Sequence, residues 1–204
     1  MDGTLVDSMK IGWEEVILKY LDDRGIKYES DIIPKIVTKG FLGISHYYVD
    51  VLGVNATAEE VYEYFMDTLE IKYKTEYKLK KGALSYLKKL KDAGCSINVI
   101  SASPMRFIEP CLKRLGVYNL CDNVLTLEQF GLNKTDKELY YKLAEKLGVE
   151  PTKCTLVEDS VYAIETAKSV GFKTIGIYEV MVENEWQKML ATADKTIMDF
   201  TEIL

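Results

Sequence analysis

The sequence has few of the residues on which several common site chemistries depend. Its 204 residues include one histidine, His46, and four widely spaced cysteines with no CxxC pair. A single histidine leaves few candidates for a Ser-His or Cys-His catalytic pair. Cysteines spaced in this way are typical of the reduced thiols of a cytoplasmic protein, and they argue against a zinc site or a disulfide framework.

Long apolar runs and an excess of positive charge are missing too. No apolar run approaches the roughly 18 residues of a membrane span, and the N-terminus lacks the basic-then-apolar pattern of a signal peptide. The formal net charge of -6 argues against nucleic acid or an anionic membrane as the main partner. With 48% hydrophobic and 28% charged residues, the composition indicates a soluble globular protein with one sizeable core, or one core and a smaller insert.

Helical patterns dominate the first part of the chain. Residues 8–25 have the apolar spacing of a helix that Ser8 or its neighbour Asp7 can cap, and residues 45–52 indicate a shorter helix. Thr57 and Glu60 form a capping-box pattern at the start of a long helix. No strand pattern interrupts this stretch, which is therefore predicted to be all-helical.

After Lys81 the pattern changes to short apolar strands that alternate with helices. Strands are predicted at residues 96–100, 123–126, 154–157, 174–177 and 195–198, and helices at residues 82–93, from 103 onward, 137–147, 160–170 and 183–190. Ser103 is expected to cap the second of these helices with Pro104 at its first helical position, while Pro110 can kink or divide it.

Strands that alternate with helices predict an α/β fold with a Rossmann-like, mostly parallel sheet flanked by helices. The all-helical stretch is inserted after the first loop of that sheet. We therefore expect a core domain built from residues 1–8 and 79–204, and an inserted helical cap domain at residues 9–78.

Polar residues follow several of these predicted strands, at the edge where ligands bind in such sheets. Ser101 and the pair Glu158-Asp159 each end a strand, Lys134 opens the segment before a helix, and Asp2 stands at the chain start. A carboxylate pair can hold Mg²⁺, a lysine supplies charge for phosphate oxygens, and a hydroxyl with nearby backbone amides can hold a phosphate. Taken alone, each has a plainer reading: Ser101 as a turn serine, Lys134 as a surface residue, and Asp159 as part of a solvated loop or a helix cap. Their combination indicates a site.

The chain resembles the haloacid dehalogenase-like superfamily, in the branch with a helical cap after the first motif. The resemblance covers nearly the whole chain and rests on four motifs. These are the Asp-Gly-Thr-Leu-Val-Asp-Ser run at residues 2–8, the strand that ends at Ser101, Lys134 ahead of Leu-Gly-Val at 147–149, and the strand followed by Glu-Asp-Ser at 158–160.

The resemblance implies a role for each motif residue. Asp2 is the general acid/base and lends its backbone carbonyl to Mg²⁺, Ser101 and Ala102 bind the transferring phosphoryl group, and Lys134 balances the charge of nucleophile and phosphate. Glu158 and Asp159 complete the Mg²⁺ site. The implied activity is that of a Mg²⁺-dependent phosphatase acting on a small phosphorylated metabolite through an aspartyl-phosphate, in a monomer or weak homodimer. A sugar-phosphate mutase of the same superfamily and an inactive binding or regulatory member remain alternatives.

Three departures from the family pattern bear on this reading. Thr135-Asp136-Lys137 stand where many relatives have Pro-x-Pro-Asp, and Ala163 stands where a glycine is usual. The nucleophilic aspartate would lie immediately before Met1, together with the apolar strand that leads to it. We expect a start assigned at an internal methionine, further residues outside this sequence, or a non-catalytic member. A rival alignment makes Asp2 the nucleophile, with Thr4 in the second position.

Overall fold

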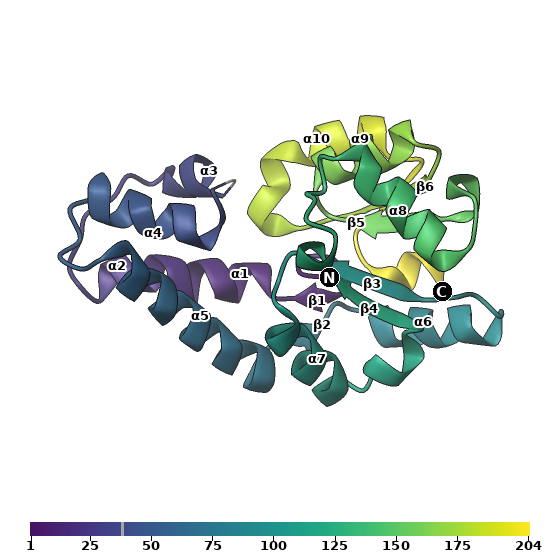
Figure 1. Cartoon of the computed structure of the whole chain (residues 1–204), viewed down its shortest axis with the longest axis horizontal. Helices are drawn as coiled ribbons and strands as arrows, with labels where there is room; N and C mark the ends of the chain where they lie inside the picture. The colour runs from purple at the N-terminus through teal and green to yellow at the C-terminus, as the bar shows by residue number, and fades with distance from the viewer. Residues whose placement is uncertain (38) are drawn as a thin grey trace. The chain divides into compact units, whose positions relative to one another are not determined.

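The structure is a computed structural model that describes residues 1–37 and 39–204 (Figure 1). The chain forms two compact units. The first contains Met1–Met9 and Tyr77–Leu204, and the second contains Lys10–Glu76. None of the helices in these described ranges is long and apolar enough to cross a membrane.

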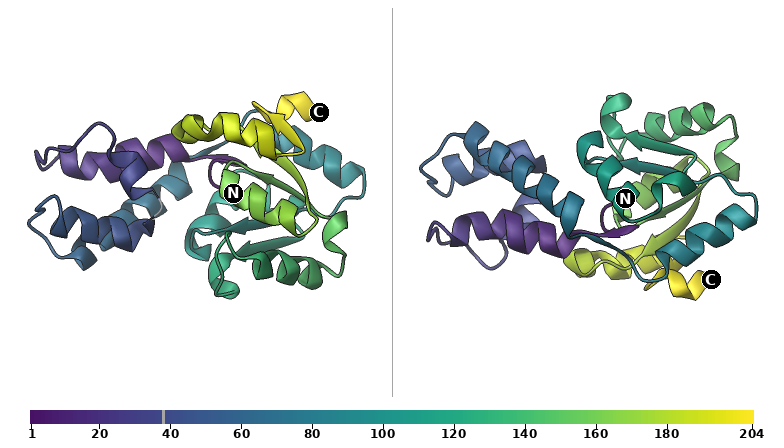
Figure 2. Two further views of the ribbon diagram at one scale, coloured as in Figure 1. Left: turned by 90° about the horizontal axis from the view of Figure 1, so that it is seen from above. Right: turned by 90° about the horizontal axis from the view of Figure 1, so that it is seen from below.

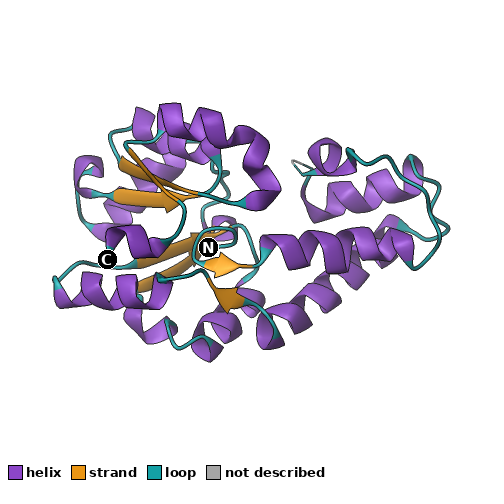
Figure 3. Ribbon diagram, turned by 180° about the vertical axis from the view of Figure 1, so that it is seen from behind, coloured by secondary structure: helices purple, strands orange, loops and turns teal. Residues whose placement is uncertain are grey.

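The first unit holds the described strands, drawn in orange in Figure 3. They are β1 (Val6–Asp7), β2 (Lys78–Leu79), β3 (Asn98–Ser101), β4 (Asn123–Thr126), β5 (Thr155–Glu158), β6 (Lys173–Ile177) and β7 (Lys195–Ile197). β3 pairs with β4, and β5, β6 and β7 pair in that order, all of them in parallel. β1 and β2 form a separate antiparallel pair. The predicted α/β fold with a mostly parallel sheet is confirmed, with the described parallel strands in two groups.

Helices flank both groups of parallel strands. They are α6 (Ala83–Asp92), α7 (Met105–Arg114), α8 (Lys137–Leu147), α9 (Val161–Ser169) and α10 (Trp186–Thr192). Short 3₁₀ turns complete the unit: η2 (Tyr118–Leu120), η3 (Leu127–Gln129), η4 (Pro151–Lys153), η5 (Val180–Glu185) and η6 (Phe200–Ile203). α7 packs beside β4, and α9 beside β5 and β6 (Figure 1). α10 packs beside β7.

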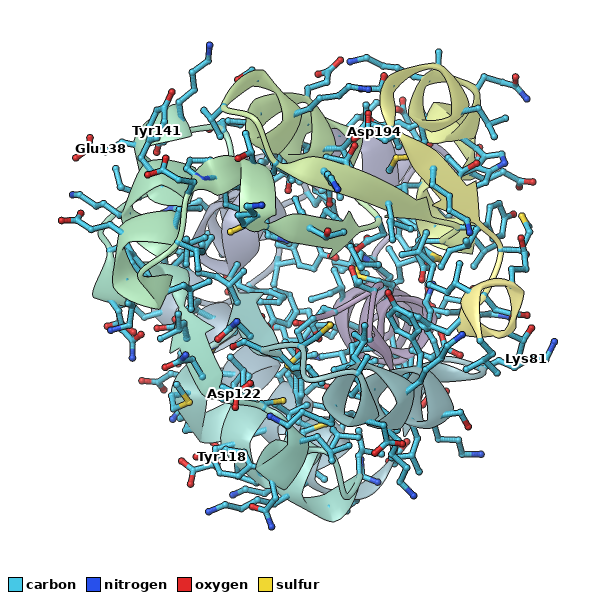
Figure 4. All side chains as sticks on the ribbon, turned by 90° about the vertical axis from the view of Figure 1, so that its right-hand side faces the viewer. Lys81, Tyr118, Asp122, Glu138, Tyr141 and Asp194 are labelled. Atoms are coloured by element: carbon cyan, nitrogen blue, oxygen red, sulfur yellow. The ribbon has the colours of Figure 1, made fainter. Side chains whose placement is uncertain are left out.

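The amphipathic pattern of α8 fixes which of its faces is buried. Leu139, Tyr140 and Leu143 are buried, and they pack in one core cluster with Phe172 of the segment before β6. Glu138 and Tyr141 lie on the outer side of the helix (Figure 4). Burying a large apolar side chain contributes about 1.5–3 kcal/mol, so this face holds α8 against the neighbouring helix α9.

The start of α7 differs from the prediction. The N-cap is Pro104, whose extended backbone (φ -61°, ψ 147°) precedes the first helical residue Met105, and no side chain caps the helix. Ser103 is not the cap because its hydroxyl donates to a carboxylate elsewhere, as described below. Pro110 lies inside the helix without dividing it. A proline removes one backbone donor, and the four buried residues of α7 supply the packing that offsets this loss.

The helical unit is flanked in the chain by β1 and by β2, and these two segments are hydrogen-bonded to each other and to the rest of the first unit. Beyond the β1–β2 pairing, the Lys80 N–H donates to the Leu5 carbonyl at 3.0 Å. The Lys80 ammonium lies 2.8 Å from Glu179 and donates to the Tyr178 carbonyl at 2.6 Å. Both charged side chains are largely buried, at 11% and 2% exposed. The end of β6 therefore anchors this pair of connecting segments.

The second unit is all-helical, as predicted. Its elements are α1 (Met9–Ile11), η1 (Gly12–Leu18), α2 (Lys19–Asp22), α3 (Ile32–Ile36), α4 (Gly40–Asp50) and α5 (Ala58–Thr75). α5 packs against α4 and against η1 (Figure 2). The capping box is confirmed, because the Thr57 N–H donates to Glu60 at 2.7 Å and the Glu60 N–H donates to the Thr57 hydroxyl at 3.1 Å.

Three details of this unit were not predicted. The middle of the first helix, η1, is a π-helix, and the Ile17 carbonyl within it accepts a hydrogen bond from the buried Tyr48 hydroxyl at 3.0 Å. α3 was missed. α4 begins at Gly40, five residues before the predicted start at 45. Glycines at 40 and 43 weaken the local helix signal, and packing against α5 overrides it.

Candidate functional site

The site is built around the loop at the start of the chain, which closes on itself. The Met1 carbonyl accepts hydrogen bonds from the N–H groups of Leu5 and Val6 at 2.8 and 3.0 Å. The Gly3 N–H donates to the Val6 carbonyl at 3.0 Å, and Gly3 takes the left-handed conformation with φ +68°. Glycine adopts this conformation at no steric cost. The closed loop holds Asp2 and Thr4 in fixed directions.

Asp2 accepts hydrogen bonds from three serines. The Ser8 hydroxyl donates to Asp2 Oδ1 at 2.8 Å. The hydroxyls of Ser101 and Ser103 donate to Asp2 Oδ2 at 3.1 and 3.0 Å, and the Ser103 N–H donates to the Ser101 hydroxyl at 3.0 Å. Since Ser101 ends β3, the loop is tied to the carboxyl end of that strand. We call these four residues the Asp2–serine cluster.

A second cluster, formed by Lys134, Glu158, Asp159 and Thr4, contains buried charges. The Lys134 ammonium lies 2.8 Å from Glu158 Oε2, and the Thr4 hydroxyl donates to Asp159 Oδ1 at 2.6 Å. Glu158 and Asp159 are 3% and 5% exposed, and the Lys134 side chain is 15% exposed. This lysine–carboxylate cluster lies at the carboxyl end of β5.

The charges of this cluster set one another's protonation. Burial by itself would raise the pKa of Glu158, but the Lys134 ammonium lowers it to about 2. Burial and then the negative charge of Glu158 raise the pKa of Asp159 to about 7. Burial opposes the charge on Lys134, yet the two carboxylates raise its pKa above the usual range. The Lys134 ammonium thus acts on two buried carboxyl groups, and it favours the ionised form of Glu158 more than that of Asp159.

Gly3 links the two clusters. A β-carbon at this position would lie 2.4 Å from Asp159 Oδ2, so the loop backbone packs directly against that carboxyl group. The neighbouring Asp2 bonds the serines at the end of β3. A single loop therefore contacts the carboxyl ends of two strands. These are β3, which ends at Ser101, and β5, which ends at Glu158 and is followed by Asp159.

The predicted site residues are distributed between these clusters. The structure joins Asp2 to Ser101 and Lys134 to Glu158, while Asp159 reaches the loop through Thr4. Ala102 is exposed in the bend between β3 and α7.

Sequence reasoning missed the contacts of Thr4, Ser8 and Ser103. Thr4 and Ser8 belong to the Asp-Gly-Thr-Leu-Val-Asp-Ser run, which could have indicated them. Ser103 lacked such a signal, because a serine before a proline also has the pattern of a helix cap.

The plainer reading of Asp159-Ser160 as a helix cap is wrong. Ser160 is the N-cap residue of α9, but its side chain makes no capping hydrogen bond. Its N–H donates instead to Glu158 Oε1 at 3.2 Å, and the Asp159 carboxylate accepts from Thr4. The Asp159 side chain is therefore held toward the loop at the chain start, and that of Glu158 toward Lys134.

The donor set fits a magnesium ion that is only partly enclosed by protein. Across residues 1–37 and 39–204, no group of three His, Cys, Asp or Glu side chains is arranged to hold a metal ion together. Mg²⁺ is usually held by one or two carboxylates, with water and substrate phosphate oxygens completing its shell. Glu158 and Asp159 are two adjacent buried carboxyl groups that repel each other when ionised, so a nearby cation would favour the ionised form of Asp159.

Fold and site together define an α/β protein with a carboxylate, hydroxyl and lysine site at the carboxyl ends of parallel strands. The chain belongs to the haloacid dehalogenase-like hydrolases, because a sequence model of that family matches residues 1–171. The family resemblance seen in the motifs is confirmed.

Similar proteins include phosphatases. The chain is 29% identical over 122 residues to the validoxylamine A 7'-phosphate phosphatase of Streptomyces hygroscopicus subsp. limoneus, a match that covers 60% of this chain and 55% of that protein. It is 23% identical over 175 residues to the phosphorylated carbohydrates phosphatase of Thermotoga maritima, covering 86% of this chain and 81% of that protein. The crystal structure of CbbY from Rhodobacter sphaeroides with phosphate matches with a TM-score of 0.80 at 16% identity, over 100% of this chain and 93% of that one. This last likeness shows the fold.

Proposed function

We propose that the protein is a Mg²⁺-dependent phosphatase that hydrolyses a small phosphorylated metabolite through an aspartyl-phosphate. The observation that carries the proposal is the loop that holds Asp2 among three hydroxyls and also packs against the buried Lys134–Glu158–Asp159 group. Proton transfer and neutralisation of phosphate charge are the two tasks of such a reaction, and each cluster suits one of them.

The proposed nucleophile is the aspartate that the family pattern places immediately before Met1. Its carboxylate attacks phosphorus, the bond from phosphorus to the substrate oxygen breaks, and Asp2 gives that oxygen a proton. Asp2 then takes a proton from water as the water attacks phosphorus and releases the aspartate. The products are the dephosphorylated metabolite and inorganic phosphate.

The remaining residues hold the phosphoryl group. In the proposal, the Ser101 hydroxyl and the Ala102 backbone amide bind phosphoryl oxygens, and Lys134 balances the charge of nucleophile and phosphate. Asp159 and Glu158, with the Asp2 carbonyl, would hold the Mg²⁺, which when bound neutralises charge on the phosphoryl oxygens.

The helical residues 9–78 would act as a cap that selects the substrate and excludes water during the reaction. We further propose that the protein acts in the cytoplasm as a monomer or weak homodimer, with the metabolite and not nucleic acid or membrane as its partner.

The test compares two extended chains that differ in one residue. Each carries a short apolar segment before Met1 and ends that segment in Asp or in Asn. With Mg²⁺, the Asp form is expected to hydrolyse p-nitrophenyl phosphate and to lose this activity on chelation, while the Asn form binds phosphate without turnover. A folded Asp form that is inactive on p-nitrophenyl phosphate and on a panel of sugar phosphates would overturn the proposal. Isomerisation of a sugar phosphate without phosphate release would instead indicate a mutase.

A further inference from the structure

Tyr140 is a buried tyrosine whose hydroxyl reaches two main-chain carbonyls near the site. It lies on α8, is 2% exposed, and packs its ring edge-on against Phe172 with 5.6 Å between ring centroids. Its hydroxyl lies 2.9 Å from the Lys134 carbonyl and 3.2 Å from the Ala163 carbonyl. Tyr141, the next residue, is 52% exposed. The core contact with Phe172 fixes where the Tyr140 hydroxyl can reach.

The two carbonyls belong to the two segments that carry the buried charges. Lys134 sits in a turn in which the Asn133 N–H donates to Asp136 at 2.7 Å and the Asp136 N–H donates to the Asn133 carbonyl at 2.9 Å. Ala163 is in the first turn of α9, directly after Glu158-Asp159-Ser160. A hydroxyl shared between the two carbonyls therefore ties the lysine segment to the carboxylate segment.

This tie acts on the main chain of Lys134, whose side chain is long and flexible. The turn at 133–136 is closed by bonds within itself, and these bonds do not fix its distance from α9. The Tyr140 hydroxyl adds a direct tie between this turn and α9, close to the residue whose ammonium lies 2.8 Å from Glu158. Because burial raises the pKa of Tyr140, its hydroxyl keeps the proton that it donates.

We propose that Tyr140 is a positioning residue that holds Lys134 against Glu158 and Asp159 for the reaction. The part of the proposal that concerns catalysis rests on the proposed phosphatase function. The part that concerns the position of the Lys134 turn does not, and it can be measured without activity.

The test uses two matched variants, Tyr140→Phe and Tyr48→Phe. Tyr48 is also fully buried, and its hydroxyl donates to a main-chain carbonyl, that of Ile17, at 3.0 Å in the helical unit. Each variant keeps the ring and loses one buried hydrogen bond, so a purely structural role predicts similar losses of thermal stability. Only Tyr140→Phe removes a contact with the Lys134 segment.

Two readouts separate positioning from stability. By hydrogen exchange in the full chain, the amides of Asn133 and Asp136 are expected to exchange roughly fivefold faster in Tyr140→Phe, as the loss of about one hydrogen bond implies, and at the parent rate in Tyr48→Phe. In the Asp-extended chain, kcat on p-nitrophenyl phosphate is expected to fall roughly tenfold or more in Tyr140→Phe with a much smaller change in KM. A misplacement on the order of 1 Å costs up to roughly a hundredfold.

Each outcome decides the proposal. Equal exchange of the 133–136 amides in the two variants overturns it, whatever happens to activity. Faster exchange in Tyr140→Phe with an unchanged kcat also overturns it, because the turn then moves without consequence for the reaction. If the extended parent is inactive while the exchange difference is present, the phosphatase proposal fails and the positioning of Lys134 by Tyr140 stands.

Discussion

The Asp2–serine cluster and the lysine–carboxylate cluster are two ways of holding carboxyl groups at the carboxyl ends of β3 and β5, which belong to separate groups of parallel strands. In the first, one carboxylate accepts bonds from three neutral hydroxyls. In the second, the Lys134 ammonium faces two buried carboxyl groups. The Asp2 carboxylate is held by several neutral hydrogen-bond donors, whereas Glu158 is held in a charged ion pair. The second cluster should therefore tolerate the loss of one group far less well than the first.

Removal of the Lys134 ammonium is expected to have the largest effect. Lys134→Met leaves Glu158 buried without its ion-pair partner, and breaking a buried ion pair in this way costs about 3–5 kcal/mol of unfolding free energy. Urea unfolding followed by circular dichroism measures the loss. Lys142→Met is the matched control, because its partner Glu138 lies on the exposed side of the same helix, and such a pair is worth about 0–1 kcal/mol. Equal losses in the two variants would contradict the contrast between the clusters.

Gly3 tests how closely the loop fits between the clusters. Gly3→Ala adds left-handed strain of about 1–2 kcal/mol and a contact at 2.4 Å with Asp159. Gly53→Ala, with φ +70° and no atom within 4 Å of the added carbon, carries the strain alone. The difference between the two variants is expected to be about 1–3 kcal/mol, the usual cost of overpacking. No difference would mean that the loop moves away from Asp159 without cost.

Loss of one hydroxyl from the Asp2–serine cluster is expected to have a smaller effect. Ser8→Ala and Ser101→Ala should each cost about 0.5–1.5 kcal/mol in urea unfolding, because two donors to Asp2 remain. Ser101→Ala should lie at the upper end, since the Ser103 N–H also loses its acceptor. If either variant lost as much unfolding free energy as Lys134→Met, the remaining hydroxyls would not be enough to hold Asp2.

Replacement of the exposed Asp122 is expected to have the smallest effect on stability. Asp122 can be compared with the buried Glu158, because the pKa of each is lowered to about 2. A hydrogen bond from Lys91 and then one from the Ile97 N–H lower the pKa of Asp122 to about 2, although this residue, labelled in Figure 4, lies at the surface. Its folded pKa is below the unpaired value of 3.8, so the stability it contributes is present above pH 3.8 and is lost as the pH falls through about 2. In Asp122→Asn, the free energy of unfolding should fall less steeply over this pH range. Parallel curves for variant and parent would show that solvent screens the interaction completely.

Local patterns predicted the elements that carry the site better than the contacts within it. The strand before Glu158-Asp159 and the helix at 137–147 follow from apolar spacing and length, and the structure has them within one residue. The partners of Ser103 could not be read in the same way. A serine before a proline satisfies a helix N-terminus and a distant carboxylate equally well, and only the tertiary fold brings Asp2 within reach.

For the two adjacent tyrosines of α8, the local pattern likewise predicts burial but not hydrogen-bond partners. Helical spacing with Leu139 and Leu143 places Tyr140 on the buried face and Tyr141 outside. That the Tyr140 hydroxyl meets the carbonyls of Lys134 and Ala163 depends on where α9 lies, which no local pattern encodes. The π-helical turn at 12–18 is similar, since its Ile17 carbonyl is satisfied by Tyr48 from a helix much later in the chain.

The pairing of Val6 with Leu79 also has an entropic consequence for the chain between them. These residues lie at the two ends of the helical unit, so their pairing closes a loop that contains the whole of it, and long loops are entropically costly to close. Within that unit, η1 packs against α5, which draws the two ends of the segment together once it folds. A folded helical unit therefore lowers the entropic cost of pairing β1 with β2, directly after the loop that carries Asp2 and Thr4.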